Sequence, residues 1–145
     1  MTALRLAGLD AGYDGVPVVR GLDLEVAAGE VVALLGPNGA GKSTTLRTIS
    51  GLLAPLGGTI EVLGAPAGRG PAHRLPHRGV AHVAEDRSLF AGLTVRENLR
   101  LATGVGRRAR KEAEGRAAAL FPALGPLMTR RAGLLSGGEQ QMLAV

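Results

Sequence analysis

Cysteine is absent from this chain of 145 residues, and aromatic residues make up only 2% of it. Without thiols the chain can form neither a disulfide framework nor a thiolate-bound metal site, which fits the cytoplasm. The scarcity of aromatic rings removes the platforms on which nucleic-acid bases stack. The net charge of +5, from 17 basic and 12 acidic residues, therefore favours solvated surfaces or a protein partner over nucleic acid.

Long apolar runs are missing too. The longest one spans residues 31–35, far short of the roughly 20 residues that a membrane-spanning helix needs. The first ten residues lack a basic segment followed by an apolar stretch, so no secretory signal is predicted. With 46% apolar residues, the chain can still bury the core of one ordinary domain.

The front of the chain has the pattern of strands. Apolar and polar residues alternate near Leu4 and again over residues 22–26, which predicts two half-buried strands. The apolar runs 31–35 and 80–84 predict strands covered on both faces, and residues 57–64 predict a short strand in a hairpin. A proline-rich connector follows at residues 65–78.

The back of the chain has the pattern of helices. A capping box from Thr94 to Glu97 predicts a helix from Val95 to about Ala102. A second capping box starts at Ser136. Between them, one apolar helical stripe interrupted by Pro122 is predicted, made of Ala109, Ala113, Ala117, Leu120 and Leu124.

Between the strand-like front and a helix that stops at Gly51 lies a loop with the pattern G-x-x-x-x-G-K-[ST]. Its N–H groups and the helix start would surround phosphates. Lys42 would reach the β and γ phosphate oxygens of a nucleotide, and the Ser43 hydroxyl would bind Mg²⁺. The alternative is a plain turn in a chain with 23 glycines, but one of only two lysines directly follows the second glycine. The predicted phosphate-binding residues are Gly36, Pro37, Asn38, Gly39, Ala40, Gly41, Lys42, Ser43 and Thr44.

The stretch "LSGGEQQ" at residues 135–141 opens a helix whose free N–H groups and dipole can face an anion. Alone it could be a simple serine cap. Together with the glycine loop, however, it resembles the ATP-binding cassette (ABC) ATPases. In that family the signature contacts the ATP of a partner ATPase, which assigns this role to Leu135, Ser136, Gly137, Gly138, Glu139 and Gln140.

The resemblance implies an α/β fold, with a P-loop NTPase core, an antiparallel β region and a helical subdomain. It assigns residues 1–84 to the nucleotide-binding core and β region, and residues 85–145 to the helical subdomain ending in the signature. The C-terminal part of the core is expected to be missing, because the sequence stops within the signature helix. In the family the missing strands lie between the two apolar strands predicted at residues 31–35 and 80–84.

Two further site residues follow from the resemblance. Tyr13 matches the aromatic residue that stacks on adenine, although a strand end often carries a surface aromatic. Glu85 stands where the family usually has a glutamine that contacts Mg²⁺ and the attacking water, which makes it a catalytic candidate beside Lys42. A carboxylate can ligate Mg²⁺ but cannot donate an amide hydrogen bond, and a solvated acid is the alternative.

Glu85, "LTVREN" and "LSGGEQQML" together resemble the ATP-binding subunits of branched-chain amino acid importers. Importers of urea or of another amino acid are the nearest alternatives. The resemblance implies membrane permease subunits, a second ABC ATPase subunit and, indirectly, a periplasmic or extracellular substrate-binding protein as partners. It places the protein at the cytoplasmic face of the cell membrane, and no nucleic acid is expected.

The acidic pair that supplies the family's general base has no match here. All three histidines precede the signature, so the family's switch histidine is unmatched as well. ATP hydrolysis is therefore expected of the complete protein and not of these 145 residues alone. A DNA-repair ATPase of this family is a rival, but only 94 positions separate Lys42 from Ser136, too few for the long insertions of that group. A catalytically inactive nucleotide-binding module is the other rival.

Overall fold

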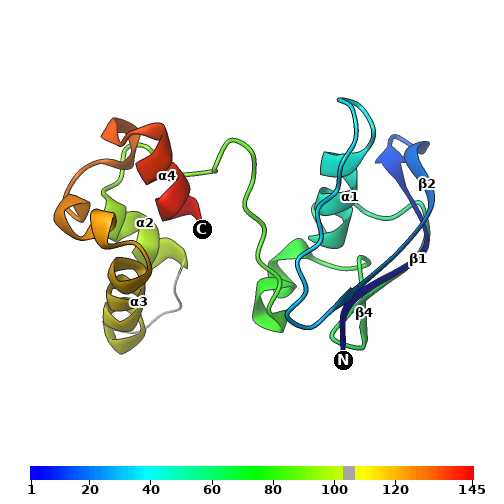
Figure 1. Cartoon of the computed structure of the whole chain (residues 1–145), viewed down its shortest axis with the longest axis horizontal. Coiled ribbons are helices and arrows are strands. Elements are labelled where there is room, and N and C mark those ends of the chain that lie inside the picture. Colours follow the sequence, from blue (N-terminus) through cyan, green and yellow to red (C-terminus); the bar gives the residue numbers. More distant parts are fainter. Residues whose placement is uncertain (103–106) are drawn as a thin grey trace. The chain divides into compact units, whose positions relative to one another are not determined.

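The computed structural model describes residues 1–102 and 107–145 of the chain. Figure 1 shows the strands and the first helix in the front part of the chain and the remaining helices in its back part. The described residues form two compact units, Met1–His82 and Val83–Val145. The assignment of the chain to a nucleotide-binding part and a helical subdomain that meet at residue 85 stays a prediction.

The first unit is built on a four-stranded antiparallel sheet. Its strands are β1 (Thr2–Tyr13), β2 (Val16–Ala27), β3 (Gly57–Val62) and β4 (Ala65–Ala67), and their order is β2-β1-β3-β4. The alternating patterns of the sequence are thus confirmed as strands, as is the hairpin that begins at residue 57.

The core of this unit lies on one face of the sheet. Its buried members are Leu6, Leu9, Ala11, Ile60 and Val62. Complete burial of one such aliphatic side chain stabilises the fold by about 1.5–3 kcal/mol. Helix α1 (Lys42–Ile49) packs against this core through Ile49. The sheet therefore fixes the position of the helix that follows the glycine loop.

The two apolar runs do not form strands, contrary to the prediction. Residues 31–35 and 80–84 have no strand structure, and Val31 and Leu35 are 94% and 90% exposed. A central strand needs a hydrogen-bonded neighbour on each side. Neither run pairs with a strand among residues 1–102 and 107–145. An apolar run indicates that a segment is suited to burial, but it forms a strand only where adjacent strands can pair with it.

The second unit is helical. It contains α2 (Val95–Ala102), α3 (Arg107–Leu120) and α4 (Gly137–Ala144), with 3₁₀ segments at Pro122–Leu127 and Ala132–Leu134. The first unit contains two further 3₁₀ turns, Ala72–Arg74 and Pro76–Arg78. No helix of the described ranges is both long enough and apolar enough to span a membrane.

Both predicted capping boxes are present in this unit. The Thr94 N–H donates to Glu97 Oε2 at 2.8 Å, and the Glu97 N–H donates back to Thr94 Oγ1 at 3.2 Å. The core beneath the helices consists of Val95, Leu124, Met128, Ala132, Leu135 and Leu143. The caps and this core together fix where α2 and α4 begin.

The predicted apolar stripe of α3 is only partly realised. Ala113 and Ala117 are half-buried and Leu124 is buried, but Leu120 is 74% exposed. The helix ends at Leu120 before Pro122, so Leu124 reaches the core from a 3₁₀ segment. The side chain of Ala109 lies outside the described residues. Glu114 instead ties α3 to α2, with contacts of 3.1 Å to Arg96 and 3.0 Å to Arg100.

Candidate functional site

The loop before α1 turns by means of its glycines. Gly36, Gly39 and Gly41 have φ angles of 155°, 84° and 90°, a range that other residues rarely adopt. Gly41 is also short of space, because a Cβ atom there would clash with the side chain of Val19. Any other residue at position 41 would have to move the loop or β2. The glycine pattern is therefore a local requirement of this backbone.

The start of α1 differs from the starts of α2 and α4. Gly41 gives α1 no side-chain cap, and the first turn of α1 carries no acidic residue. By contrast, α4 has a capping box with Glu139 in its first turn. The first N–H groups of a helix need an acceptor, and the positive end of its dipole attracts anions. The start of α1 thus has the features of an anion-binding site.

Lys42 folds back over the glycine loop. Its Nζ atom donates hydrogen bonds to the carbonyl oxygens of Gly36 and Pro37, each at 2.7 Å. An ammonium group has three protons to donate, so a third remains for an anion in the loop. Ser43 is exposed in the first turn of the helix. The predicted Lys42 and Ser43 therefore lie at the same helix end.

Tyr13 is connected to the same helix. It ends β1, its side chain is 42% exposed, and its hydroxyl accepts a hydrogen bond from Arg47 Nη1 at 3.3 Å. Hydrogen bonding by the side chains of Thr44 and then Arg47 lowers the pKa of Tyr13 below its ordinary value. Sequence reasoning missed Arg47. The one available signal was its position one helical turn after Thr44, on the same face.

The signature residues form the predicted helix start. The Ser136 N–H donates to Glu139 Oε2 at 2.7 Å, and the Glu139 N–H donates to Ser136 Oγ at 3.4 Å. The Ser136 backbone N–H, followed by the Ser136 side chain, holds the pKa of Glu139 below its ordinary value. Leu135 is buried in the helical core. Gly137 and Gly138, which lie between Ser136 and Glu139, are exposed.

Glu85 is exposed in a turn and does not end a strand. It belongs to the unit Val83–Val145, together with the signature residues, whereas the glycine loop and Tyr13 belong to Met1–His82. Sequence reasoning also missed Arg87, which donates from Nε to Gln141 Oε1 and from Nη1 to Gln140 Oε1, both at 3.1 Å. No motif signalled this contact.

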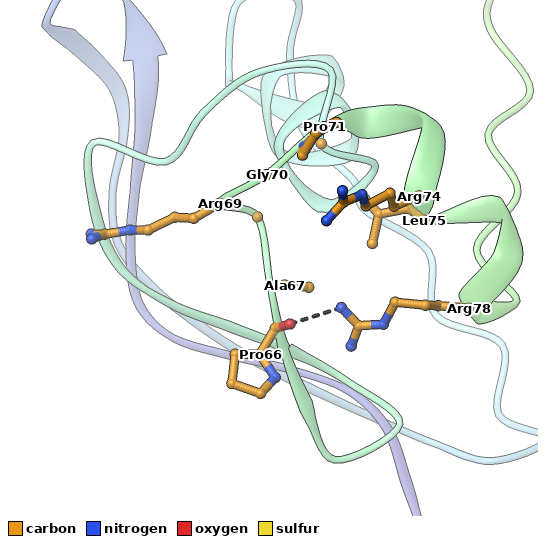
Figure 2. A pocket seen from close by; sticks show the side chains of 10 residues that line it. Pro66, Ala67, Arg69, Gly70, Pro71, Arg74, Leu75 and Arg78 are labelled. Carbon is orange, nitrogen blue, oxygen red and sulfur yellow. Dashed lines mark hydrogen bonds between the residues drawn. The ribbon is translucent and has the colours of Figure 1, made fainter.

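A pocket of about 300 Å³ lies elsewhere in the first unit (Figure 2). Arg74 and Arg78 reach into it, and Leu75 is part of its wall. Arg78 is already engaged, because it donates to the carbonyl oxygens of Pro66 and Ala65 at 2.8 Å. The pocket includes no residue of the glycine loop, so it is distinct from the predicted nucleotide site.

The residues at α1 fit a nucleotide with a bound magnesium ion. Uncapped helix N–H groups and an ammonium suit phosphates. Mg²⁺ in nucleotide sites takes most ligands from phosphates and water, with one or two from protein, and the exposed Ser43 hydroxyl can supply one. Within the described ranges no cluster of three acidic, histidine or cysteine side chains could hold a metal alone. The Ser43 hydroxyl is thus suited to a metal that phosphate oxygens hold as well.

Comparison with known proteins gives consistent matches. The family described as ABC transporter matches residues 19–145. A probable branched-chain amino acid transport ATP-binding protein of Archaeoglobus fulgidus is 38% identical over 143 residues, which are 98% of this chain and 61% of that protein. An Fe(3+) ions import ATP-binding protein of Mesorhizobium japonicum is 39% identical, over 100% of this chain and 41% of that protein. The chain thus spans about three-fifths or less of these two relatives.

A solved structure of the ATP-binding subunit of an ABC transporter has the same fold. Its TM-score is 0.81 at 32% identity, and the match covers 98% of this chain and 59% of that one. The predicted fold class, an α/β cassette with an antiparallel β region, is confirmed by this likeness.

Proposed function

Because the chain belongs to the ABC transporter family, which matches residues 19–145, we propose that it is the ATP-binding part of an importer ATPase. The observation that carries this proposal is the start of α1, which lacks a side-chain cap and has Lys42 folded over its glycine loop. Such a helix end is arranged to receive phosphate. The complete ATPase would hydrolyse ATP to drive transport.

In this proposal each site residue has one task. Residues 36–44 surround the phosphates, and Lys42, held at the loop carbonyls, directs its remaining ammonium proton toward the β and γ oxygens. Tyr13 stacks on the adenine. Mg²⁺, when bound with ATP, offsets the charge on the phosphate oxygens, and Ser43 and Glu85 would hold it. The signature residues 135–140 contact the ATP of a second ATPase subunit.

We further propose that the imported solute is a branched-chain amino acid. Glu85 and the segments around residues 94 and 136 support this, as does the Archaeoglobus fulgidus relative. An Fe(3+) ions import ATP-binding protein is similarly identical to this chain, so ferric ion is tested beside the amino acid. Urea and other amino acids are the alternatives to test.

The proposed partners are membrane permease subunits, a second ABC ATPase subunit and, through the permease, a substrate-binding protein. The proposed location is the cytoplasmic face of the membrane. An ATPase that docks on a permease should purify with membranes when both are expressed together. If the protein instead remains soluble and retains DNA through a high-salt wash, a DNA-repair function is favoured.

The decisive experiment uses the full-length protein in complex with its permease in lipid vesicles. ATP hydrolysis is measured with the substrate-binding protein carrying leucine, urea or ferric ion. We expect stimulation by the leucine-loaded protein, with the Lys42→Ala complex as the inactive control. If only the urea-loaded or the iron-loaded protein stimulated hydrolysis, the proposal that the solute is a branched-chain amino acid would be contradicted. The absence of ATP binding by the folded protein would contradict the whole proposal.

A further inference from the structure

The turn around Arg87 is held in an unusual backbone conformation. Arg87 and Ser88 have φ angles of 62° and 47°, in the left-handed region that non-glycine residues rarely adopt. The Arg87 N–H donates to the Ala84 carbonyl at 2.9 Å, and Asp86 Oδ1 accepts from both the N–H and the hydroxyl of Ser88. Such a conformation persists only where its surroundings fix it.

The side chain of Arg87 makes a long-range contact with the signature helix. It is half-buried, and its Nε and Nη1 atoms donate at 3.1 Å to the side-chain oxygens of Gln141 and Gln140. These partners lie 54 and 53 positions further along the chain. A planar guanidinium can serve two acceptors at once in a fixed geometry.

The contact continues to the first residues of the signature. Gln140 Nε2 donates to the carbonyl oxygens of Leu135 and Ala132, both at 3.3 Å. Arg87 Nη2 lies 3.7 Å from the position that a Cβ atom of Gly137 would take. The guanidinium is therefore connected, through one amide, to the backbone on which Ser136 begins α4, and its charge lies beside the first residue of that helix.

We propose that Arg87 is a positioning residue that holds the signature helix start in register with the turn that carries Glu85. This proposal rests on the proposed function, since it assigns Arg87 a role in ATP hydrolysis by two subunits. The signature residues would face the partner's ATP with their geometry already set, and a shift of α4 would be transmitted to the turn at Glu85. Arg87 touches neither ATP nor Mg²⁺ in this role.

A purely structural role of Arg87 predicts a different effect of its removal on stability and ATP turnover. If Arg87 only joined two segments of the helical unit, its removal would lower stability and leave ATP-dependent steps unchanged in the folded fraction. A positioning role predicts unchanged ATP binding by the isolated subunit, because the side-chain partners of Arg87 are Gln140 and Gln141 and not residues of the phosphate loop. It also predicts weaker ATP-driven association of two subunits and a lower kcat.

The test uses the full-length protein and the variants Arg87→Ala and Arg87→Lys. Arg116→Ala is the matched control, because it removes the same charge from an exposed position of the same unit. We measure ATP affinity of the monomer and ATP-driven dimerisation without Mg²⁺, then kcat and KM with Mg²⁺. Misplacement by about 1 Å can cost 10²-fold in rate. We therefore expect Arg87→Ala to lower kcat by about 10- to 100-fold, with monomer affinity within about twofold.

Two further results make the inference falsifiable. Gln141→Ala added to Arg87→Ala should cause little further loss, because coupled residues are not additive. Arg87→Lys keeps the positive charge but lacks the planar group that serves two acceptors at once, so its kcat should stay below that of the wild type. Wild-type turnover in that variant would overturn the proposal. Equal dimerisation and kcat in Arg87→Ala and wild type would overturn it as well. A wild-type protein that binds no ATP would instead overturn the proposed function.

Discussion

Replacing Lys42 with alanine should weaken the binding of nucleotides that carry a β-phosphate. The Lys42 ammonium is held at the loop by two hydrogen bonds of 2.7 Å, so it is already close to where the phosphates would lie. A charge-assisted hydrogen bond contributes about 1.5–3 kcal/mol. Since 1.4 kcal/mol corresponds to a tenfold change in affinity, the loss should be about 10- to 100-fold.

The assay is an equilibrium titration of the full-length protein with ATP, ADP and AMP. Lys42→Ala should lose affinity for ATP and ADP but not for AMP, because the ammonium is directed at the β and γ oxygens. Lys111→Ala is the matched control, since Lys111 is the only other lysine and is exposed on α3. Unchanged ATP affinity in a folded Lys42→Ala protein, or an equal loss for AMP, would refute the reasoning.

Four other outcomes are expected. Tyr13→Ala should weaken ATP and GTP alike, by roughly 1–3 kcal/mol of lost stacking, while Tyr13→Phe should change little; a large loss in the phenylalanine variant would show that the bond to Arg47 matters. Leu124→Ala should lower the free energy of unfolding by about 2–5 kcal/mol in denaturant titrations, because Leu124 is fully buried. Because the cap lowers the pKa of Glu139, its contribution to stability is fully present above the ordinary glutamate pKa and is lost as the pH falls through the lower folded pKa. Glu139→Gln can still form a capping box and should flatten this part of the unfolding-versus-pH curve. Residues 1–145 alone should release no phosphate above the Lys42→Ala background, since loss of a positioned base costs about 10²–10⁴-fold.

Features set by neighbouring residues could be predicted from the sequence. The capping boxes at Thr94 and Ser136 need only residues three positions apart, and both are present. The turn that joins β1 and β2 is local too, because Asp14 and Gly15 adopt the positive φ angles of a tight turn, but the alternating pattern predicted only the two strands and not their hairpin. The glycine loop was recognisable for the same reason, since its pattern reflects the backbone that it must form.

Features set by distant residues could not be predicted. Residues 31–35 have the composition of a buried strand, but pairing depends on a neighbour that composition does not reveal. The contact of Arg87 with Gln140 crosses 53 positions, and that of Tyr13 with Arg47 crosses 34. An arginine in a polar segment gives no sign of its partner. The sequence therefore located the loop and the signature without the contacts that support them.

The cap of α4 limits how many donors that helix start can offer to an incoming anion. Of the first four N–H groups, that of Ser136 already serves Glu139, and that of Glu139 already serves Ser136. The remaining two of the four, the N–H groups of Gly137 and Gly138, take no part in the capping box. An anion at this helix start would thus meet two adjacent glycine amides, with the Glu139 carboxylate nearby as a like charge and the Arg87 guanidinium beside Gly137 as an opposite charge. The cap thus leaves the start of α4 with fewer free donors than the start of α1, which has no side-chain cap.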